Sequence, residues 1–251
     1  MKKRLWSRWI LALAVVWPFM AAAHDRVREK ENFDFDWKFI LNADDRANAG
    51  MQVSETGWQD VQLPHDWSIS QNFDPKLSGS NGHLPGGIGW YRKMFRVDKK
   101  DKGRRIAVLF DGIYSRSDVY VNGQHLGFRP YGFCYQEYDL TPYLNYGAEN
   151  VLAVRVNNPL EHDSVARWYT GAGIYRHAWL VKTAEVHVAS YGTYVTTPVV
   201  TAERAEVRVR TSVANEAERT KTLSVRQQIT DGEGRTVVQS GKQALQVAAG
   251  Q

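Results

Sequence analysis

The chain has 251 residues, a net charge of +5 at neutral pH and one cysteine, Cys134. A single cysteine excludes an internal disulfide, so the stability of the fold must come from a packed core. Residues 1–23 contain no acidic residue and account for four of the positive charges, from Lys2, Lys3, Arg4 and Arg8. The remaining +1 gives no reason to expect a nucleic-acid partner.

The first residues are typical of a secretory signal. The basic start precedes a short apolar run, Ile10–Phe19, and then the small residues Ala21-Ala22-Ala23 that a signal peptidase requires. The run is short for a membrane span, although a retained anchor is the alternative. We expect residues 1–23 to be a signal peptide cleaved after Ala23. This predicts a periplasmic or secreted protein with no membrane association after cleavage.

Residues 24–183 favour an all-β sandwich. Short apolar runs alternate with turn residues, and long helical periodicity is absent. Asn122-Gly123 predicts a type I′ hairpin, because both residues tolerate positive φ. The predicted strands are Phe35–Ile40, Trp58–Leu63, Trp90–Val97, Ile106–Phe110, Asp118–Val121, Asn150–Asn157 and Gly173–Val181.

Two shorter features lie between these strands. Asp139–Leu144 is expected to form a helical turn, with Thr141 as a cap and Pro142 at the first helical position. Cys134 has aromatic residues close on both sides, so we expect a buried thiol. A reactive thiol is less favoured, because no His or Lys lies near it in the sequence to lower its pKa.

Residues 184–251 have fewer aromatic residues and alternate more plainly between apolar and polar. This pattern predicts an immunoglobulin-like β-sandwich. The 68 residues fall short of the roughly 100 that such a domain needs, so we expect it to be incomplete. Missing strands would leave its inner-face residues partly uncovered and its tail open to proteolysis. Those residues include Val207, Val209, Leu223 and Val225.

Residues 167–176 read Arg-Trp-Tyr-Thr-Gly-Ala-Gly-Ile-Tyr-Arg and concentrate side chains suited to sugar contact. The Arg167 guanidinium can hold two oxygens at once. Trp168 offers a flat apolar face with a polar edge, which suits the C–H face of a sugar ring. The structural alternative is that the segment is simply the turn and entry to a strand.

Two other stretches carry polar side chains. His65-Asp66 is interpreted as structural rather than catalytic, since sequence adjacency does not supply the geometry of a triad. Asp66 is expected to cap nearby N–H groups. The glycine-rich loop, residues 72–89, carries Asn81 and His83, both able to bind a sugar hydroxyl, but a mobile surface loop is an equal alternative.

Four motifs in order resemble glycoside hydrolase family 2, which includes secreted β-galactosidases, β-glucuronidases and β-mannosidases. Besides residues 167–176, these are Leu-Pro-His-Asp-Trp at 63–67, Gly-Gly-Ile-Gly-Trp-Tyr-Arg-Lys at 86–93, and Phe-Asp-Gly at 110–112 leading to Val-Tyr-Val-Asn-Gly at 119–123. Thr170 stands where the family often has Pro. The resemblance implies a jelly-roll, galactose-binding-like sandwich at residues 24–183, followed by a partial immunoglobulin-like sandwich at 184–251.

The resemblance also implies where the chemistry lies. Glycoside hydrolysis usually needs two carboxylates, and family 2 places them on a (β/α)₈ barrel of about 250 residues. No βαβα pattern occurs in this sequence, so we expect no catalytic residue here and a partner in the missing barrel. The expected substrate-binding residues are Arg167, Trp168 and, as a weaker candidate, His83. No cofactor and no metal are expected; Asp44-Asp45 is more often a solvated pair than part of a calcium site.

Three hypotheses follow. The chain is the front part of a β-galactosidase-like enzyme, a stand-alone carbohydrate-binding module, or a structural sandwich with no sugar function. The unfinished second domain favours the first, and the aromatic and arginine residues of 167–176 disfavour the third. In either of the first two cases the ligand is a carbohydrate, a β-galactoside or a related glycan.

Overall fold

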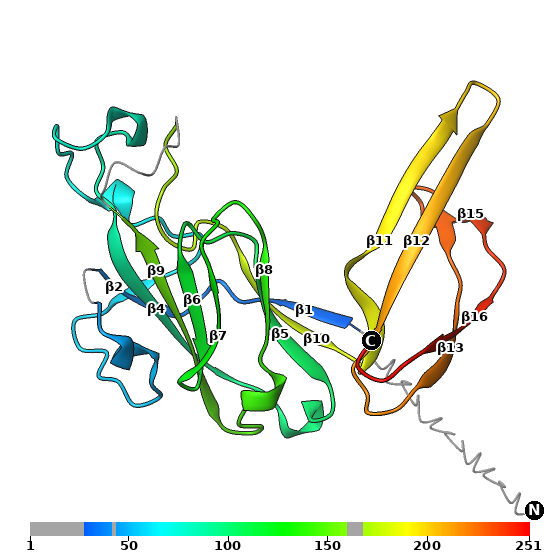
Figure 1. Cartoon of the computed structure of the whole chain (residues 1–251), viewed down its shortest axis with the longest axis horizontal. Helices are drawn as coiled ribbons and strands as arrows, with labels where there is room; N and C mark the ends of the chain where they lie inside the picture. The colour runs from blue at the N-terminus through cyan, green and yellow to red at the C-terminus, as the bar shows by residue number, and fades with distance from the viewer. Residues whose placement is uncertain (1–27, 42–43, 160–167) are drawn as a thin grey trace, which may run out of the picture.

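The computed structural model describes residues 28–41, 44–159 and 168–251, which form two β-sandwiches (Figure 1). The first sandwich packs a four-stranded sheet against a six-stranded one. The four-stranded sheet has the order β1-β10-β5-β8, with every pair antiparallel. Its strands are β1 (Arg28–Asn32), β10 (Ala178–Thr183), β5 (Arg105–Phe110) and β8 (Gln136–Asp139).

The six-stranded sheet has the order β3-β2-β4-β9-β6-β7, again antiparallel throughout. The core between the two sheets is rich in aromatic side chains, among them Trp37, Tyr91 and Phe110, which are fully buried. Such a core supplies the stability that a chain with one cysteine needs. The strands are β3 (Gln59–Val61), β2 (Trp37–Leu41), β4 (Gly87–Arg96), β9 (Glu149–Asn158), β6 (Ser117–Val121) and β7 (Gln124–Arg129).

The second sandwich consists of three antiparallel strand pairs (Figure 1). Within residues 184–251, Ala217 and Val247 are the only buried apolar residues, and Val207 is 40% exposed. Its core is therefore much weaker than that of the first sandwich. The pairs are β11 (Val186–Val200) with β12 (Ala205–Asn215), β13 (Lys221–Val225) with β16 (Gln243–Val247), and β14 (Gln228–Thr230) with β15 (Thr236–Gln239).

The predicted all-β class is confirmed. The described residues contain 3₁₀ turns but no α-helix, and none of their helices is long and apolar enough to cross a membrane. The 3₁₀ turns are η1 (Arg46–Ala49), η2 (Ser68–Ser70), η3 (Gly79–Asn81), η4 (Lys99–Asp101) and η5 (Thr141–Tyr143). The predicted signal peptide, residues 1–23, lies outside the described residues.

Several strand predictions are confirmed, and the hairpin is the sharpest case. Asn122 and Gly123 have φ of 51° and 85°, as a type I′ turn requires, and join β6 to β7. The predicted run Ile106–Phe110 is buried throughout and corresponds to β5.

Other predictions were wrong in detail. The strand expected at Gly173–Val181 begins only at Ala178. Gly173, with a φ of 125°, forms instead an isolated antiparallel bridge to Tyr114. The expected first strand begins at Trp37 and is preceded by β1, which is polar along its whole length. The Cys134 thiol is half-buried rather than buried, between the exposed rings of Phe133 and Tyr135.

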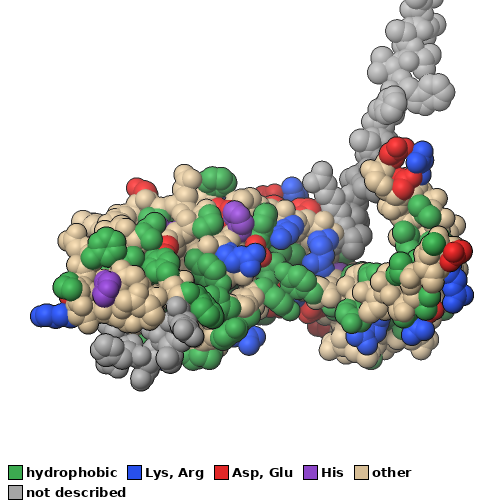
Figure 2. All heavy atoms as spheres, turned by 90° about the horizontal axis from the view of Figure 1, so that it is seen from above, with side chains coloured by type: hydrophobic (Ala, Val, Ile, Leu, Met, Phe, Trp, Pro, Cys, Tyr) green, Lys and Arg blue, Asp and Glu red, His purple; other side chains and the backbone are tan. Residues whose placement is uncertain are grey.

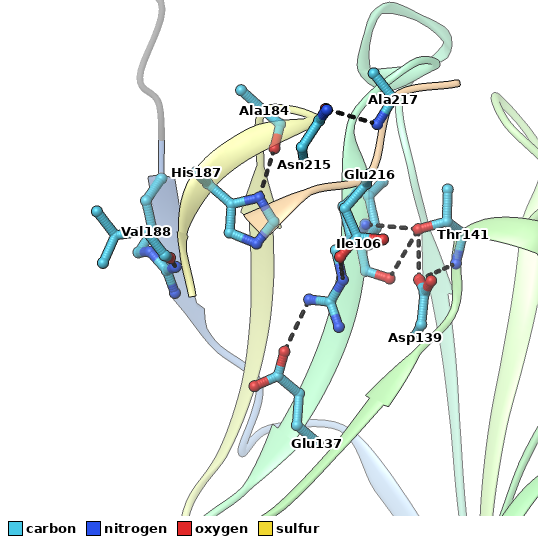
Figure 3. Close-up of polar contacts among 12 residues, drawn as sticks. Ile106, Glu137, Asp139, Thr141, Ala184, His187, Val188, Asn215, Glu216 and Ala217 are labelled. Atoms are coloured by element: carbon cyan, nitrogen blue, oxygen red, sulfur yellow. Dashed lines mark hydrogen bonds and ion pairs between the residues drawn. The ribbon is translucent and has the colours of Figure 1, made fainter. Parts of the chain in front are cut away.

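The helical turn near Pro142 is also arranged differently from the prediction. Leu140 occupies the cap position, and the Asp139 carboxylate supplies the capping bond by accepting from the Thr141 amide at 2.9 Å. The Thr141 hydroxyl instead accepts from the Ile106 amide at 2.8 Å, which ties the turn to β5 (Figure 3).

Polar side chains meet at the junction between the sandwiches (Figure 3). Arg105 of β5 pairs with Glu137 at 2.8 Å in the first sandwich and with Glu216 at 3.1 Å in the second. Arg28 of β1 donates to the Val188 carbonyl of β11. Arg105 and Arg28 thus make polar contacts between the two domains.

Candidate functional site

The site is built where two of the sequence motifs run side by side. The His65 amide donates to the Ile174 carbonyl at 2.9 Å, and the Trp67 amide donates to the Ala172 carbonyl at 3.1 Å. A Cβ at Gly173 would meet the His65 carbonyl oxygen at 2.6 Å and would also overlap the Tyr91 hydroxyl. Glycine is therefore required at this position, both for its positive φ and for the close approach of the two chains.

Asp66 is the polar centre of this arrangement. Its Oδ1 accepts hydrogen bonds from the Ser68 and Ala172 amides, both at 2.9 Å, and its Oδ2 accepts one from the Tyr169 hydroxyl at 2.5 Å. Gly171 has a φ of 71°, and a Cβ there would meet Oδ2 at 2.6 Å. One carboxylate thus fixes the turn at 169–172, which confirms the predicted capping role of Asp66.

Burial changes the proton affinities around Asp66. It raises the pKa of the Tyr169 phenol, with the hydrogen bond to Asp66 acting in the same direction. It also raises the pKa of the fully buried Tyr91 well above the ordinary value and lowers that of His65. The His65 Nδ1 lies 2.8 Å from the Tyr91 hydroxyl, so this imidazole is held as a packing element rather than beside a nucleophile.

The glycine-rich loop meets the same turn. The Asn81 side-chain oxygen accepts from the Thr170 amide at 3.3 Å and from the Thr170 hydroxyl at 3.2 Å. A proline at position 170, as the family often has, could make neither bond. The Ser68 hydroxyl donates to the Pro85 carbonyl at 2.9 Å and ties the other end of the loop to the 65–67 segment.

The predicted site residues have different environments. Trp168 is 64% exposed and presents its ring to solvent beside the fixed turn. His83 is exposed, has a φ of 58°, and its Nδ1 lies 2.8 Å from the Leu77 carbonyl of its own loop. Arg167 lies outside the described residues. The structure brings the loop and the turn together through Asn81 and Thr170.

Three contributors were missed by sequence reasoning. Tyr169 was considered only as an aromatic ring and Thr170 only as a departure from the family's Pro, although both make the bonds that position the turn. Asn158, at the end of β9, donates to the Gly171 carbonyl at 3.2 Å. No local signal marks Asn158, because its partner is reached only through the fold.

The acidic pair Asp44-Asp45 has structural partners. Asp44 accepts from Arg155 at 2.8 Å, an ion pair that lowers the pKa of its carboxyl, and Asp45 caps η1 by accepting from the Ala47 amide at 2.9 Å. Within the described part of the chain, no group of three or more His, Cys, Asp or Glu side chains has a geometry that could hold a metal ion.

Taken together, the arrangement is a rigid turn bordered by a polar loop, with an indole face open to solvent. It offers one apolar ring for stacking and hydroxyl and amide groups for hydrogen bonding, the combination that suits a sugar. Residues 65–67 and 168–173 contribute one side and residues 79–89 the other.

Comparisons with known proteins agree with this geometry. Residues 31–184 match the family model described as "Glycosyl hydrolases family 2, sugar binding domain". The β-galactosidase BoGH2A of Bacteroides ovatus is 44% identical over 221 residues, which is 85% of this chain and 25% of that protein. A β-glucuronidase of Formosa agariphila is 33% identical, over 86% of this chain and 24% of that protein.

A solved structure also matches. It is a family 2 glycosyl hydrolase from Bacteroides cellulosilyticus, 40% identical, with a TM-score of 0.76 over 86% of this chain and 29% of that one. The chain thus spans about a quarter of the length of the curated relatives that it matches.

Proposed function

The chain belongs to glycoside hydrolase family 2, and we propose that it is the non-catalytic N-terminal part of a longer β-galactosidase-like enzyme that hydrolyses O-glycosidic bonds. Its role there is to supply loops that line the sugar pocket of a catalytic barrel. The observation that carries the proposal is the fixed turn at 168–173, which holds Trp168 exposed beside the glycine-rich loop.

The proposed ligand is a β-galactoside or a related glycan. Galactoside is preferred over glucuronide because the relative with the higher identity of the two compared above, at 44% against 33%, is a β-galactosidase. Trp168 is proposed to stack on the sugar ring, and Arg167 to hold its hydroxyls with a bidentate fork. His83 is a weaker candidate, since its Nδ1 already faces the Leu77 carbonyl.

A chimera tests the proposal. Residues 28–251 would replace the matched quarter of BoGH2A, and hydrolysis of aryl β-galactosides and aryl β-glucuronides would be measured. We expect the chimera to cleave the galactoside and the isolated chain to cleave neither. Arg167→Lys and Trp168→Ala should each lower kcat/KM, and Tyr143→Ala, an exposed ring on η5, serves as the matched control.

The chimera also separates this role from that of a stand-alone binding module. A folded chimera whose kcat/KM is unchanged by Arg167→Lys and Trp168→Ala would show that these residues do not line the pocket. Micromolar binding of soluble glycans by the isolated chain, abolished by Trp168→Ala, would favour the module instead. We also propose export through the 1–23 signal, to be checked by cell fractionation.

A further inference from the structure

Outside the candidate site, the first sandwich carries an exposed aromatic surface. It is continuous with a ring on β11 of the second sandwich. Figure 2 shows hydrophobic side chains interrupting the polar surface of the first sandwich. The aromatic surface consists of Tyr114, Tyr131, Phe133, Tyr135, Tyr175 and Tyr191.

Its outer rings are open to solvent. Tyr131 is 62% exposed, Phe133 45%, Tyr135 49% and Tyr191 67%. Scattered exposed apolar residues need no explanation, whereas exposed aromatic rings that contact one another are typical of an interaction surface. The six rings form two groups of contacting rings. Phe133 is the centre of one group, and Tyr135 pairs with Tyr191 in the other. The two groups are neighbours because Phe133 and Tyr135 are two residues apart in the chain.

The surface is preformed rather than a set of loose rings. A Cβ at Gly112 would meet the Tyr175 ring at 2.7 Å, and one at Gly132 would overlap the Tyr114 ring. The Tyr175 hydroxyl donates to the Gly132 carbonyl at 2.9 Å. Two glycines and one hydrogen bond thus fix the positions of Tyr114 and Tyr175, the two rings that pack against Phe133. Binding at this surface therefore loses little side-chain conformational entropy.

The ring orientations distinguish between kinds of partner. Phe133 meets Tyr131 and Tyr175 edge-on, each at 72°, and meets Tyr114 at 49°. Because these rings are inclined to one another, the surface is uneven. It lacks the flat aromatic face on which a sugar ring stacks. Closely packed aromatic knobs are instead typical of the buried centre of a protein–protein interface.

The surface also continues an existing domain contact. Tyr135 and Tyr191 lie 4.5 Å apart between ring centroids, which joins the two sandwiches. Tyr191 has a φ of 53° in an irregularity of β11, and a Cβ at the next residue, Gly192, would meet backbone oxygens at 2.8 Å. A tyrosine in this conformation is strained, and such strain is usually retained where the side chain has a use.

The aromatic surface adjoins the candidate site. Tyr114 and Gly173 exchange backbone hydrogen bonds of 2.8 and 2.9 Å. These bonds connect the aromatic surface directly to the glycine of the 168–173 turn. A domain seated on these rings would therefore adjoin the segment 168–173, which carries Trp168. Most of the length of each matched relative lies outside the region that this chain matches.

We propose that the aromatic surface is the docking face for the catalytic domain of the longer enzyme, with Tyr131 and Phe133 as its central anchors. This inference rests on the proposed function, because it names the partner that completes the sugar pocket. Docking here holds the barrel against both sandwiches at once.

The test compares one substitution in two settings. Tyr131→Asp is made in the isolated chain and in the BoGH2A chimera, with Tyr143→Asp as the matched control, since Tyr143 is 43% exposed on η5. Tyr131→Asp should leave the Tm of the isolated chain unchanged and lower that of the chimera by several degrees. Tyr143→Asp should change neither.

A second measurement needs no chimera. The isolated chain should bind the hydrophobic dye 1-anilinonaphthalene-8-sulfonate, and Phe133→Ser should lower the fluorescence while Tyr143→Asp leaves it unchanged. No dye binding, or equal Tm shifts in both settings, overturns the proposal. So does displacement of the dye by oligosaccharides, which would make the surface a glycan site.

The two proposals fail in different ways. A folded chimera without galactosidase activity refutes the proposed function, while its Tm comparison still decides the docking face. A chimera that does not fold, when both parent proteins do, means that this surface does not accept the catalytic domain and overturns the docking proposal.

Discussion

Removing the Asp66 carboxylate should destabilise the first sandwich by disrupting the turn at 169–172. In Asp66→Ala, the Ser68 and Ala172 amides lose their acceptor, and both residues are fully buried. An unsatisfied buried donor costs about 1–3 kcal/mol. The Tyr169 hydroxyl is partly exposed and can turn to water, so it adds little. We expect a loss of about 3–5 kcal/mol of unfolding free energy.

Asp66→Asn is the matched control. The asparagine keeps an oxygen at the Oδ1 position for both amides and replaces only the oxygen that accepts from Tyr169. Because the Tyr169 hydroxyl can rotate to accept a hydrogen bond from the new amide group, the cost should be about 1 kcal/mol. Tyr169→Phe should cost about the same, since it removes the same bond from the other side.

Urea unfolding followed by tryptophan fluorescence measures these differences in the first sandwich alone, because residues 184–251 contain no tryptophan. The expected order of stability is wild type, then Asp66→Asn and Tyr169→Phe together, then Asp66→Ala well below. If Asp66→Ala unfolds within about 0.5 kcal/mol of wild type, the range of an ordinary surface substitution, the carboxylate does not organise the turn.

Three further predictions concern the same molecule. Gly173→Ala should cost more than about 3 kcal/mol in the same assay, since the new Cβ would collide with the His65 carbonyl; soluble, fully stable protein would contradict this. Stability of the first sandwich should fall as the pH drops below the ordinary histidine pKa of 6.5, because burial lowers the pKa of folded His65 and the unfolded chain then binds more protons. His65→Gln should flatten that slope, and an unchanged slope would assign it to other groups. Limited proteolysis followed by mass spectrometry should cut within residues 184–251 first, because few apolar side chains are buried there, and equal resistance of the two sandwiches would refute this.

Local chemistry predicted the features that depend on one or two residues. The Asn122-Gly123 turn follows from two positive φ angles, and Asp66 was expected to cap N–H groups because its residue type does so in turns. The run Ile106–Phe110 has no polar residue, which is typical of a buried strand.

Features that depend on distant partners were not predictable. Tyr169 meets Asp66 across 103 positions, and Thr170 meets Asn81 across 89. Nothing near either residue indicates these contacts. The polar strand β1 was missed for the same reason, since its hydrogen-bonding partner β10 lies at the other end of the domain.

That pairing has a consequence for folding. The register joins Arg28 to Thr183, so the four-stranded sheet can close only after nearly the whole domain has been synthesised. Until β10 has been synthesised, residues 28–32 have no strand with which to pair. Their sequence, Arg-Glu-Lys-Glu-Asn, has no apolar side chain that could recruit another chain. In the folded sheet, the Lys30 ammonium lies 3.9 Å from the centroid of the Trp179 ring, and Glu31 forms an ion pair with Lys182 at 2.9 Å. The charged side chains of residues 28–32 thus disfavour aggregation before β10 is available and contribute to the pairing of β1 with β10 afterwards.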